Sequence, residues 1–194
     1  MSWRSRKKKS MEPGRATARL RVLQSPRMTL VAATVDLVSS DIKGRSSLAE
    51  TLEAKVPDNW PPDLYDIEPM KVALRQLADT SEQGWSFWYL LAEVDGQSCA
   101  IGICGFKGRP DAGGSAEIGY SVLSQFRNQG FASEAVQRLL TWAFSHQTVN
   151  EITAETLPHL KQSISVMKKN GFEFSGPGSE MGVVRYVVKR PDGR

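Results

Sequence analysis

Residues 125–132 read Gln-Phe-Arg-Asn-Gln-Gly-Phe-Ala, and this stretch joins two segments of different character. The run before it, residues 116–123, is short and apolar, as is typical of a strand. After it, apolar residues recur every three or four positions from Ala132 to Phe144, which predicts one face of a helix. The predicted helix begins directly after a strand and a tight turn at Gly130. In such an arrangement, the free N–H groups of the turn and the positive end of the helix dipole point at the same place. The stretch therefore predicts a site for a phosphate or pyrophosphate group, and the alternative is that Gly130 only eases the turn.

Two common phosphate-binding patterns are absent from the sequence. It contains no G-x-x-x-x-G-K-[ST], which excludes a P-loop NTPase. It also contains no G-x-G-x-x-G after a strand near the start of a βαβ unit, which argues against a Rossmann dinucleotide site. If the loop binds phosphate, it therefore belongs to a different class of protein.

The C-terminal half continues with a regular order of elements. Residues 151–156 are typical of a strand, and residues 162–170 predict a short helix with Gly171 as its C-cap and two lysines in its last turn. An extended run follows at residues 172–175, and a last strand is expected at residues 181–189. The order is thus strand, R-x-x-G-x-A turn, helix, strand, short helix, N-G-F and strand.

This order and its motifs resemble the GNAT superfamily of acetyl-CoA-dependent N-acetyltransferases. E-I-G-Y-S-V-L followed by F-R-N-Q-G-F-A-S-E-A-V, and T-L-P with S-I-S-V-M-K-K-N-G-F, are similar to the branch that contains ribosomal-protein N-terminal acetyltransferases. The resemblance covers roughly residues 85–176 and is weak upstream of them. It implies an α+β GNAT fold, in which helices flank a mixed, mostly antiparallel central sheet of about six to seven strands.

The N-terminal half predicts further elements of the same domain. A first strand is expected at residues 28–34, one or two helices broken near Gly44 at residues 35–55, and a further helix at residues 64–79. Two strands at residues 85–93 and 97–106 should form a hairpin, because Asp95-Gly96 between them is a strong hairpin signal.

The charge is distributed unevenly along the 194 residues. Residues 1–27 carry nine Lys or Arg against one acid, Glu12, and so have a net charge of +8, whereas the whole chain is +4. We expect residues 1–25 to be a basic, disordered arm and residues 26–194 to be a single acetyltransferase domain. A more specific alternative is that the arm contacts RNA or the ribosome, and another is that it is an extension from an upstream start codon.

The sequence predicts a cytoplasmic protein without a membrane segment or a metal. It has no run of eighteen apolar residues and no signal peptide. Cys99 and Cys104 are five residues apart in one predicted strand, so they should lie on opposite faces, unpaired, as small buried hydrophobes in a reducing compartment. No cluster of His and Cys has the spacing of a zinc site.

By the resemblance, acetyl-CoA is the co-substrate, and its pyrophosphate lies on the backbone amides of the loop. Gly130 lets the backbone approach phosphate oxygens closely, and Ala132 is small for the same reason. The pantetheine amides should pair with the exposed edge of the preceding strand, as an added strand would. The predicted cofactor-binding residues are Tyr120, Ser121, Val122, Leu123, Arg127, Asn128, Gln129, Gly130, Phe131, Ala132 and Ser163.

Glu117 is the candidate general base, because an amine must lose a proton when it attacks a thioester. The alternatives are an exposed strand residue or a carboxylate that holds a substrate cation. Two positions depart from the family: Leu160 replaces an Asn before the short helix, and Met167 replaces a Tyr proposed as the general acid. Direct transfer without that acid is still feasible, since thiolate is a tolerable leaving group.

Two function classes follow. The first is an enzyme that moves acetyl from acetyl-CoA to a primary amine, either a protein N-terminus or a small molecule, in a ternary complex. The second is a non-catalytic acyl-CoA-binding module that senses or scaffolds. Either is expected to be a monomer or homodimer. The candidates for the wall of the pocket that binds the acceptor amine are Trp60, Trp85 and Trp88. For at least two of them, packing in the core is the alternative.

Overall fold

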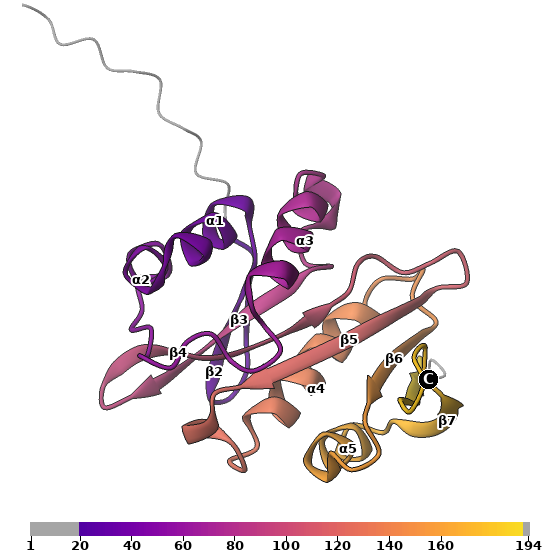
Figure 1. The fold of residues 1–194 in the computed structure, drawn as a ribbon. Coiled ribbons are helices and arrows are strands. Elements are labelled where there is room, and N and C mark those ends of the chain that lie inside the picture. Colours follow the sequence, from indigo (N-terminus) through magenta and orange to yellow (C-terminus); the bar gives the residue numbers. More distant parts are fainter. Residues whose placement is uncertain (1–19, 192–194) are drawn as a thin grey trace, which may run out of the picture.

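A computed structural model describes residues 20–191 and shows an α+β architecture built on one eight-stranded sheet (Figure 1). The strand order is β1-β2-β3-β4-β5-β6-β8-β7, and every neighbouring pair is antiparallel except β5 and β6. The predicted fold class is confirmed, and the sheet has eight strands where about six to seven were expected. The strands are β1 (Val22–Gln24), β2 (Met28–Ala32), β3 (Phe87–Val94), β4 (Gln97–Phe106), β5 (Ser115–Val122), β6 (Glu151–Thr156), β7 (Glu173–Pro177) and β8 (Val184–Lys189).

Helices cover both faces of the sheet, and each layer buries its own core. Leu37, Leu48 and Met70, from three different helices, pack with β3 and β4 on one face, whereas Leu139 and Met167 are buried on the other. The break predicted at Gly44 is present, because Gly44 has φ +128° and separates two short helices. The helices are α1 (Val35–Lys43), α2 (Arg45–Leu52) and α3 (Ile67–Leu77) on the first face and α4 (Phe131–Phe144) and α5 (Lys161–Lys169) on the second, with 3₁₀ turns η1 (Thr80–Glu82) and η2 (Ser124–Phe126).

The boundary predicted for the basic arm is wrong at its C-terminal end. Residues 22–24 form β1, which pairs with β2 in the register Val22–Val31 to Gln24–Thr29, and Leu23 packs against the core. Local periodicity missed this strand because three residues are too few to show an alternation. The rest of the predicted arm, residues 1–19, lies outside the described residues, and its role in contacting RNA or the ribosome stays a prediction.

The edge strand leads to a stability prediction. A variant that lacks residues 1–25 should unfold about 2–8 °C below a variant that lacks only residues 1–19. The shorter chain loses the β1 ladder and the hydrogen bond from Ser25 to Glu134, about 1–2 kcal/mol in total. Differential scanning calorimetry of the two variants measures the difference, and equal melting temperatures would show that β1 contributes nothing to the domain.

The Asp95-Gly96 hairpin forms as predicted, but the faces of the two cysteines do not follow the simple alternation. Asp95 and Gly96 have φ of +50° and +74°, as a tight hairpin turn requires. The pairing of β4 with β3 skips Ile101, which is the extra residue of a bulge. This extra residue reverses the alternation, so Cys99 and Cys104 lie on the same face of the sheet, both buried and unpaired.

The sheet opens between β5 and β6, and this opening positions the site. The two parallel strands pair only from Ser115–Glu151 to Glu117–Thr153. Beyond Glu117 they diverge, so that no strand within residues 20–191 pairs with this edge of β5, and α5 lies beside the gap (Figure 1). In the part of the chain that the structure describes, no helix is long and apolar enough to span a bilayer.

Candidate active site

The turn between η2 and α4 has the geometry of an anion cradle. Gly130 is the N-cap of α4 and has φ +86°, and Asn128 has φ +60°, so two residues of the turn adopt the left-handed conformation. Among residues 20–191, no group accepts a hydrogen bond from the backbone N–H groups of residues 128–133. Unpaired N–H groups at a helix N-terminus, arranged around a turn of this kind, have the geometry that phosphate oxygens require of their donors.

Arg127 points away from this cradle. Its Nε donates to the Val122 carbonyl at 2.9 Å, and its Nη2 lies 2.6 Å from Asp63 Oδ2. The guanidinium therefore ties the turn to the end of β5 and to the loop before α3. Its role in this geometry is to shape the loop, and its charge is neutralised by Asp63.

Another arginine, Arg27 in the turn between β1 and β2, packs directly on the cradle. Its Nη1 donates to the Gln129 carbonyl at 2.9 Å, its guanidinium lies over the Phe131 ring with a separation of 4.6 Å, and its Nη2 would be 3.2 Å from a Cβ at Gly130. Sequence analysis missed this residue, because about a hundred positions separate it from the loop.

Arg27 also neutralises Glu134, an acid in the first turn of α4. Its Nε and backbone N–H donate to the two carboxylate oxygens at 2.7 and 2.8 Å, and the Ser25 hydroxyl donates at 2.8 Å. Partial burial acts to raise the pKa of Glu134, but these hydrogen bonds outweigh it and lower that pKa. Glu134 is thus an anion near a predicted anion site, and Arg27 compensates its charge.

The predicted cofactor-binding residues on β5, and Leu123 directly after it, divide between the two faces of the sheet. Ser121 lines an open cleft on the α3 side, whereas Val122 and Leu123 are buried. Tyr120 bridges the opening beyond β6, since its hydroxyl donates to the Ser163 carbonyl at 2.9 Å and lies 3.1 Å from Ser163 Oγ. The structure therefore brings Tyr120 and Ser163 together at the unpaired edge of β5.

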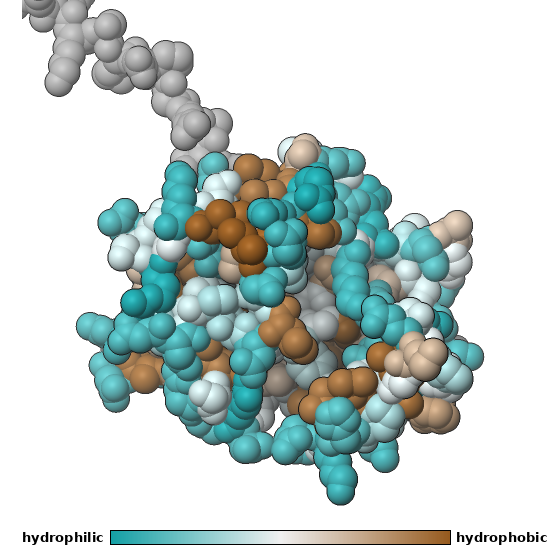
Figure 2. Space-filling model, viewed as in Figure 1, coloured by the Kyte–Doolittle hydropathy of each residue, from teal (hydrophilic) through white to brown (hydrophobic). Residues whose placement is uncertain are grey.

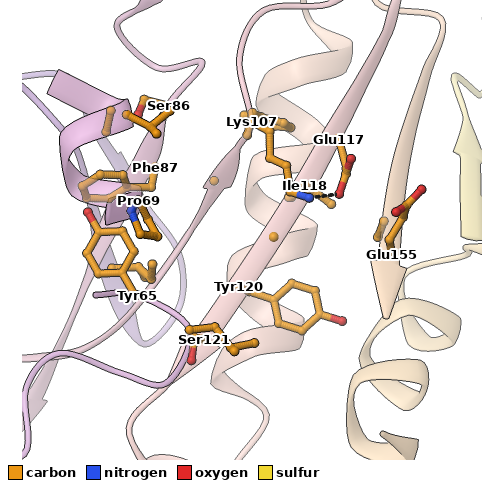
Figure 3. Close-up of a pocket in the computed structure, with 18 of the residues that line it drawn as sticks. Tyr65, Pro69, Ser86, Phe87, Lys107, Glu117, Ile118, Tyr120, Ser121 and Glu155 are labelled. Carbon is orange, nitrogen blue, oxygen red and sulfur yellow. Dashed lines mark ion pairs between the residues drawn. The ribbon is translucent and has the colours of Figure 1, made fainter. Parts of the chain in front are cut away.

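The cleft has a volume of about 790 Å³ and lies between α3, β4, β5 and β6. Figure 2 shows this face of the molecule, where pale and brown residues lie at the centre between teal ones. Glu117 points into the cleft with about a quarter of its side chain exposed, and its carboxylate forms an ion pair with Lys107, which is two-thirds exposed (Figure 3). The candidate base is thus accessible, and its partner is a lysine that sequence analysis did not single out.

A family model for the acetyltransferase (GNAT) domain matches residues 46–173, which is more than half of the chain. The chain belongs to the GNAT family. Over 171 residues it is 26% identical to an uncharacterized N-acetyltransferase of Bacillus subtilis, YjdG, which covers 87% of this chain and 99% of that protein. It is also 32% identical over 113 residues to the uncharacterized N-acetyltransferase p20 of Bacillus licheniformis, with 57% of this chain and 62% of p20 covered.

Solved acetyltransferase structures share the fold at lower identity. The ribosomal-protein-S5-alanine acetyltransferase of Vibrio fischeri matches with a TM-score of 0.63 at 16% identity and covers 89% of this chain and 98% of its own. The microcin C7 self-immunity acetyltransferase MccE, solved with acetyl-CoA and AMP, matches with a TM-score of 0.59 at 14% identity, over 84% of this chain and 93% of its own. The resemblance to the GNAT superfamily inferred from the motifs is confirmed, and the finer likeness to the ribosomal-protein branch stays a prediction.

Several side chains considered for this GNAT protein lie away from the cleft. Trp60, Trp85 and Trp88 are all buried in the core, so the aromatic wall of the cleft is made by Tyr65 and Phe87 instead. The hairpin strand was predicted to begin at residue 85 but begins at Phe87. An aromatic residue is as compatible with a core as with a pocket wall, so residue type alone could not separate these roles.

No cysteine or α5 tyrosine supplies acid or nucleophilic chemistry in the described site. Burial raises the pKa of both Cys99 and Cys104, so neither is a ready thiolate. Met167, at the position where the family resemblance led us to expect a Tyr, is fully buried, and Leu160 is the N-cap of α5 without a side-chain hydrogen bond. Burial also raises the pKa of Tyr120 to about 12, so its phenol stays protonated at neutral pH.

Proposed function

We propose that the protein transfers the acetyl group of acetyl-CoA directly to a primary amine. The observation that carries this proposal is the coincidence of two features at the opening of the sheet: the unpaired N–H groups of residues 128–133 and the carboxylate of Glu117 in the adjoining cleft. The first suits a pyrophosphate, and the second suits an amine that must lose a proton.

The cradle fits coenzyme A in shape and charge. Backbone N–H groups of Asn128, Gln129, Gly130, Phe131 and Ala132 would hold the pyrophosphate, and each bond to a charged oxygen contributes roughly 1.5–3 kcal/mol. The unpaired edge of β5 beyond Glu117 would accept the pantetheine amides as an added strand. This path leads from the N-terminus of α4 toward Glu117, which is where the thioester is needed. The Val122 carbonyl already accepts from Arg127, so the pairing is expected at Tyr120 and Ser121.

Glu117 would act on the acceptor. Its carboxylate takes a proton from the amine, directly or through one water, as the amine nitrogen forms a bond to the thioester carbon. The carbon–sulfur bond then breaks, and the thiolate leaves with the electron pair. A thiol has a pKa near 8.5, so the thiolate needs no obligatory acid.

Membership of a family of acetyltransferases favours this enzyme over a non-catalytic acyl-CoA-binding module. A module that only bound acyl-CoA would not need an accessible carboxylate in the cleft beside the cofactor edge. Two acceptor classes remain, a protein N-terminus and a small-molecule primary amine. The similar structures include a ribosomal-protein-S5-alanine acetyltransferase, which favours a protein acceptor, and MccE, which was solved with the small molecule AMP beside acetyl-CoA.

The proposal is tested by measuring release of free thiol from acetyl-CoA in the presence of a panel of amines. Acetyl-CoA should also raise the melting temperature, because a ligand that binds only the folded state stabilises it. Binding without acetyl transfer to any amine would support the binding module, and absence of both would refute the proposal.

Arg27 gives a prediction about the cradle. Arg27→Ala should weaken acetyl-CoA binding by about tenfold or more, because the Glu134 carboxylate is then uncompensated near the phosphate groups and the Gln129 carbonyl loses its donor. Isothermal titration calorimetry measures the dissociation constant of each variant.

A double-mutant comparison separates the two causes. If charge dominates, adding Glu134→Gln to Arg27→Ala should restore most of the affinity, since it removes the uncompensated anion. If the contacts with Gln129 and Phe131 dominate, the double variant should bind as weakly as Arg27→Ala alone. Arg27→Ala with wild-type affinity would contradict both explanations.

A further inference from the structure

The cleft beside Glu117 has walls that are mostly apolar. The α3 side is made by Pro69 and Val72, and Tyr65 and Phe87 stand beside them, with their rings in an edge-to-face contact at 4.6 Å (Figure 3). Ile103 from β4 continues the same surface. A group bound here would exchange water for aliphatic and aromatic carbon, which favours an apolar body.

The other acids along the cleft already have cationic partners. The side chain of Glu155 is 7% exposed, and its carboxylate accepts hydrogen bonds from Arg185 at 2.8 Å and from the Ser179 hydroxyl at 2.6 Å. Asp63 and Glu68, at the solvent rim, pair with Arg127 and Lys71 at 2.6 and 2.7 Å.

Glu117 and Glu155 are the two acids that lie inside the cleft, and of these Glu117 has the partner that is easier to displace. Lys107 reaches it on a long, mostly exposed side chain that can swing into solvent, where an exposed ion pair is worth little. An acceptor ammonium could take the place of the Lys107 ammonium. The interior of the cleft therefore offers one available carboxylate, which complements one positive charge.

The floor of the cleft is left open at a glycine. Gly119 lies two residues after Glu117 and two before Ser121, so all three point to the same side of β5. A Cβ at Gly119 would have no neighbour within 4 Å, and the residue opposite it in β4 is Gly105. The absence of a side chain at Gly119 leaves space beside the carboxylate, whereas a Cβ at Gly105 would meet the backbone of Phe87 at 2.2 Å.

We propose that the acceptor is a primary monoamine whose amino group is borne on an apolar aliphatic or aromatic body, and that Gly119 sets the size of that body. This inference rests on the proposed acetyl transfer. The ammonium replaces Lys107 at Glu117, and the body lies against Tyr65, Phe87 and Ile103. Polyamines fit poorly, because a second ammonium would meet the apolar wall or a carboxylate that is already paired.

The test compares acceptors at saturating acetyl-CoA. The probes are 2-phenylethylamine, a pentapeptide that begins with Phe, a pentapeptide that begins with Ser, and spermidine. We expect kcat/KM for the better of the two apolar probes to exceed that for spermidine and the Ser peptide by about tenfold or more. Preference for 2-phenylethylamine would identify a small-molecule acceptor, and preference for the Phe peptide would identify a peptide N-terminus.

Gly119→Leu tests the floor of the cleft. It should lower kcat/KM for the apolar acceptor by at least about tenfold, because the new side chain fills the space beside Glu117, and should leave the acetyl-CoA dissociation constant within about threefold. Ser98→Leu adds the same side chain at an exposed position at the other end of β4 and should change neither quantity. Thermal unfolding of both variants shows that they are folded.

Three results would overturn the inference. They are equal or better turnover of spermidine, undiminished turnover of the apolar amine by Gly119→Leu, and acetyl-CoA binding with no acetylation of any probe. Failure of the proposed function is distinguished by its own signature, in which acetyl-CoA neither stabilises the protein nor releases thiol with any amine.

Discussion

Gly130→Asp is expected to abolish detectable acetyl-CoA binding, with a loss of affinity of at least about 100-fold. The new carboxylate would project from the N-cap of α4 into the cradle of free N–H groups and compete with the phosphate oxygens for them. At a ligand concentration of about 100 times the dissociation constant, the wild-type protein gains about 2.7 kcal/mol, which raises its melting temperature by about 5–10 °C. The variant should show no such rise.

Gly130→Asn is the matched control for this change. Asn has nearly the same shape as Asp, carries no charge and tolerates the left-handed conformation that Gly130 adopts at φ +86°. We expect it to fold and to retain part of the affinity, so that the difference between the two variants reports the charge. Equal, strong binding by both variants would place the phosphate groups somewhere other than at this turn.

Glu117→Gln is expected to lower turnover by about 100-fold or more at pH 7 and to leave acetyl-CoA affinity nearly unchanged. Gln keeps the shape of the side chain but cannot accept the proton of the amine. The deficit should shrink as pH rises, because an acceptor that is already a free amine needs the base less. The measurement is kcat as a function of pH together with the acetyl-CoA dissociation constant.

Lys107→Gln is the control that isolates the role of the carboxylate. Both substitutions break the Lys107–Glu117 ion pair, but this one leaves the proposed base in place. Turnover of Lys107→Gln within a few-fold of wild type, beside the large loss in Glu117→Gln, would assign the effect to proton transfer. Equal losses in the two variants would assign it to the ion pair and return Glu117 to a structural role.

Local sequence signals predicted most of the fold. Gly44 separates α1 from α2, Asp95-Gly96 turns the hairpin, and the turn at Gly130 precedes α4, in each case because the residue type fixes the backbone conformation nearby. The family resemblance supplied what local signals do not contain, the assembly of these elements into one mostly antiparallel sheet.

The features that the sequence did not predict have a common physical origin, namely contacts between residues far apart in the chain. The bulge at Ile101, which puts Cys99 and Cys104 on one face, follows from pairing with β3 and leaves no mark in the local sequence. Arg27 reaches the cradle only because the turn between β1 and β2 packs on α4. Lys107 meets Glu117 because β4 and β5 are neighbours in the sheet, so its role depends equally on tertiary structure.

The most direct test of the account is a crystal structure of the protein with coenzyme A. We expect the pyrophosphate to accept hydrogen bonds from the backbone N–H groups of residues 128–133 and the pantetheine to follow the unpaired edge of β5 toward Glu117. A pyrophosphate bound elsewhere, or a thiol end that points away from the cleft of Glu117, would contradict it.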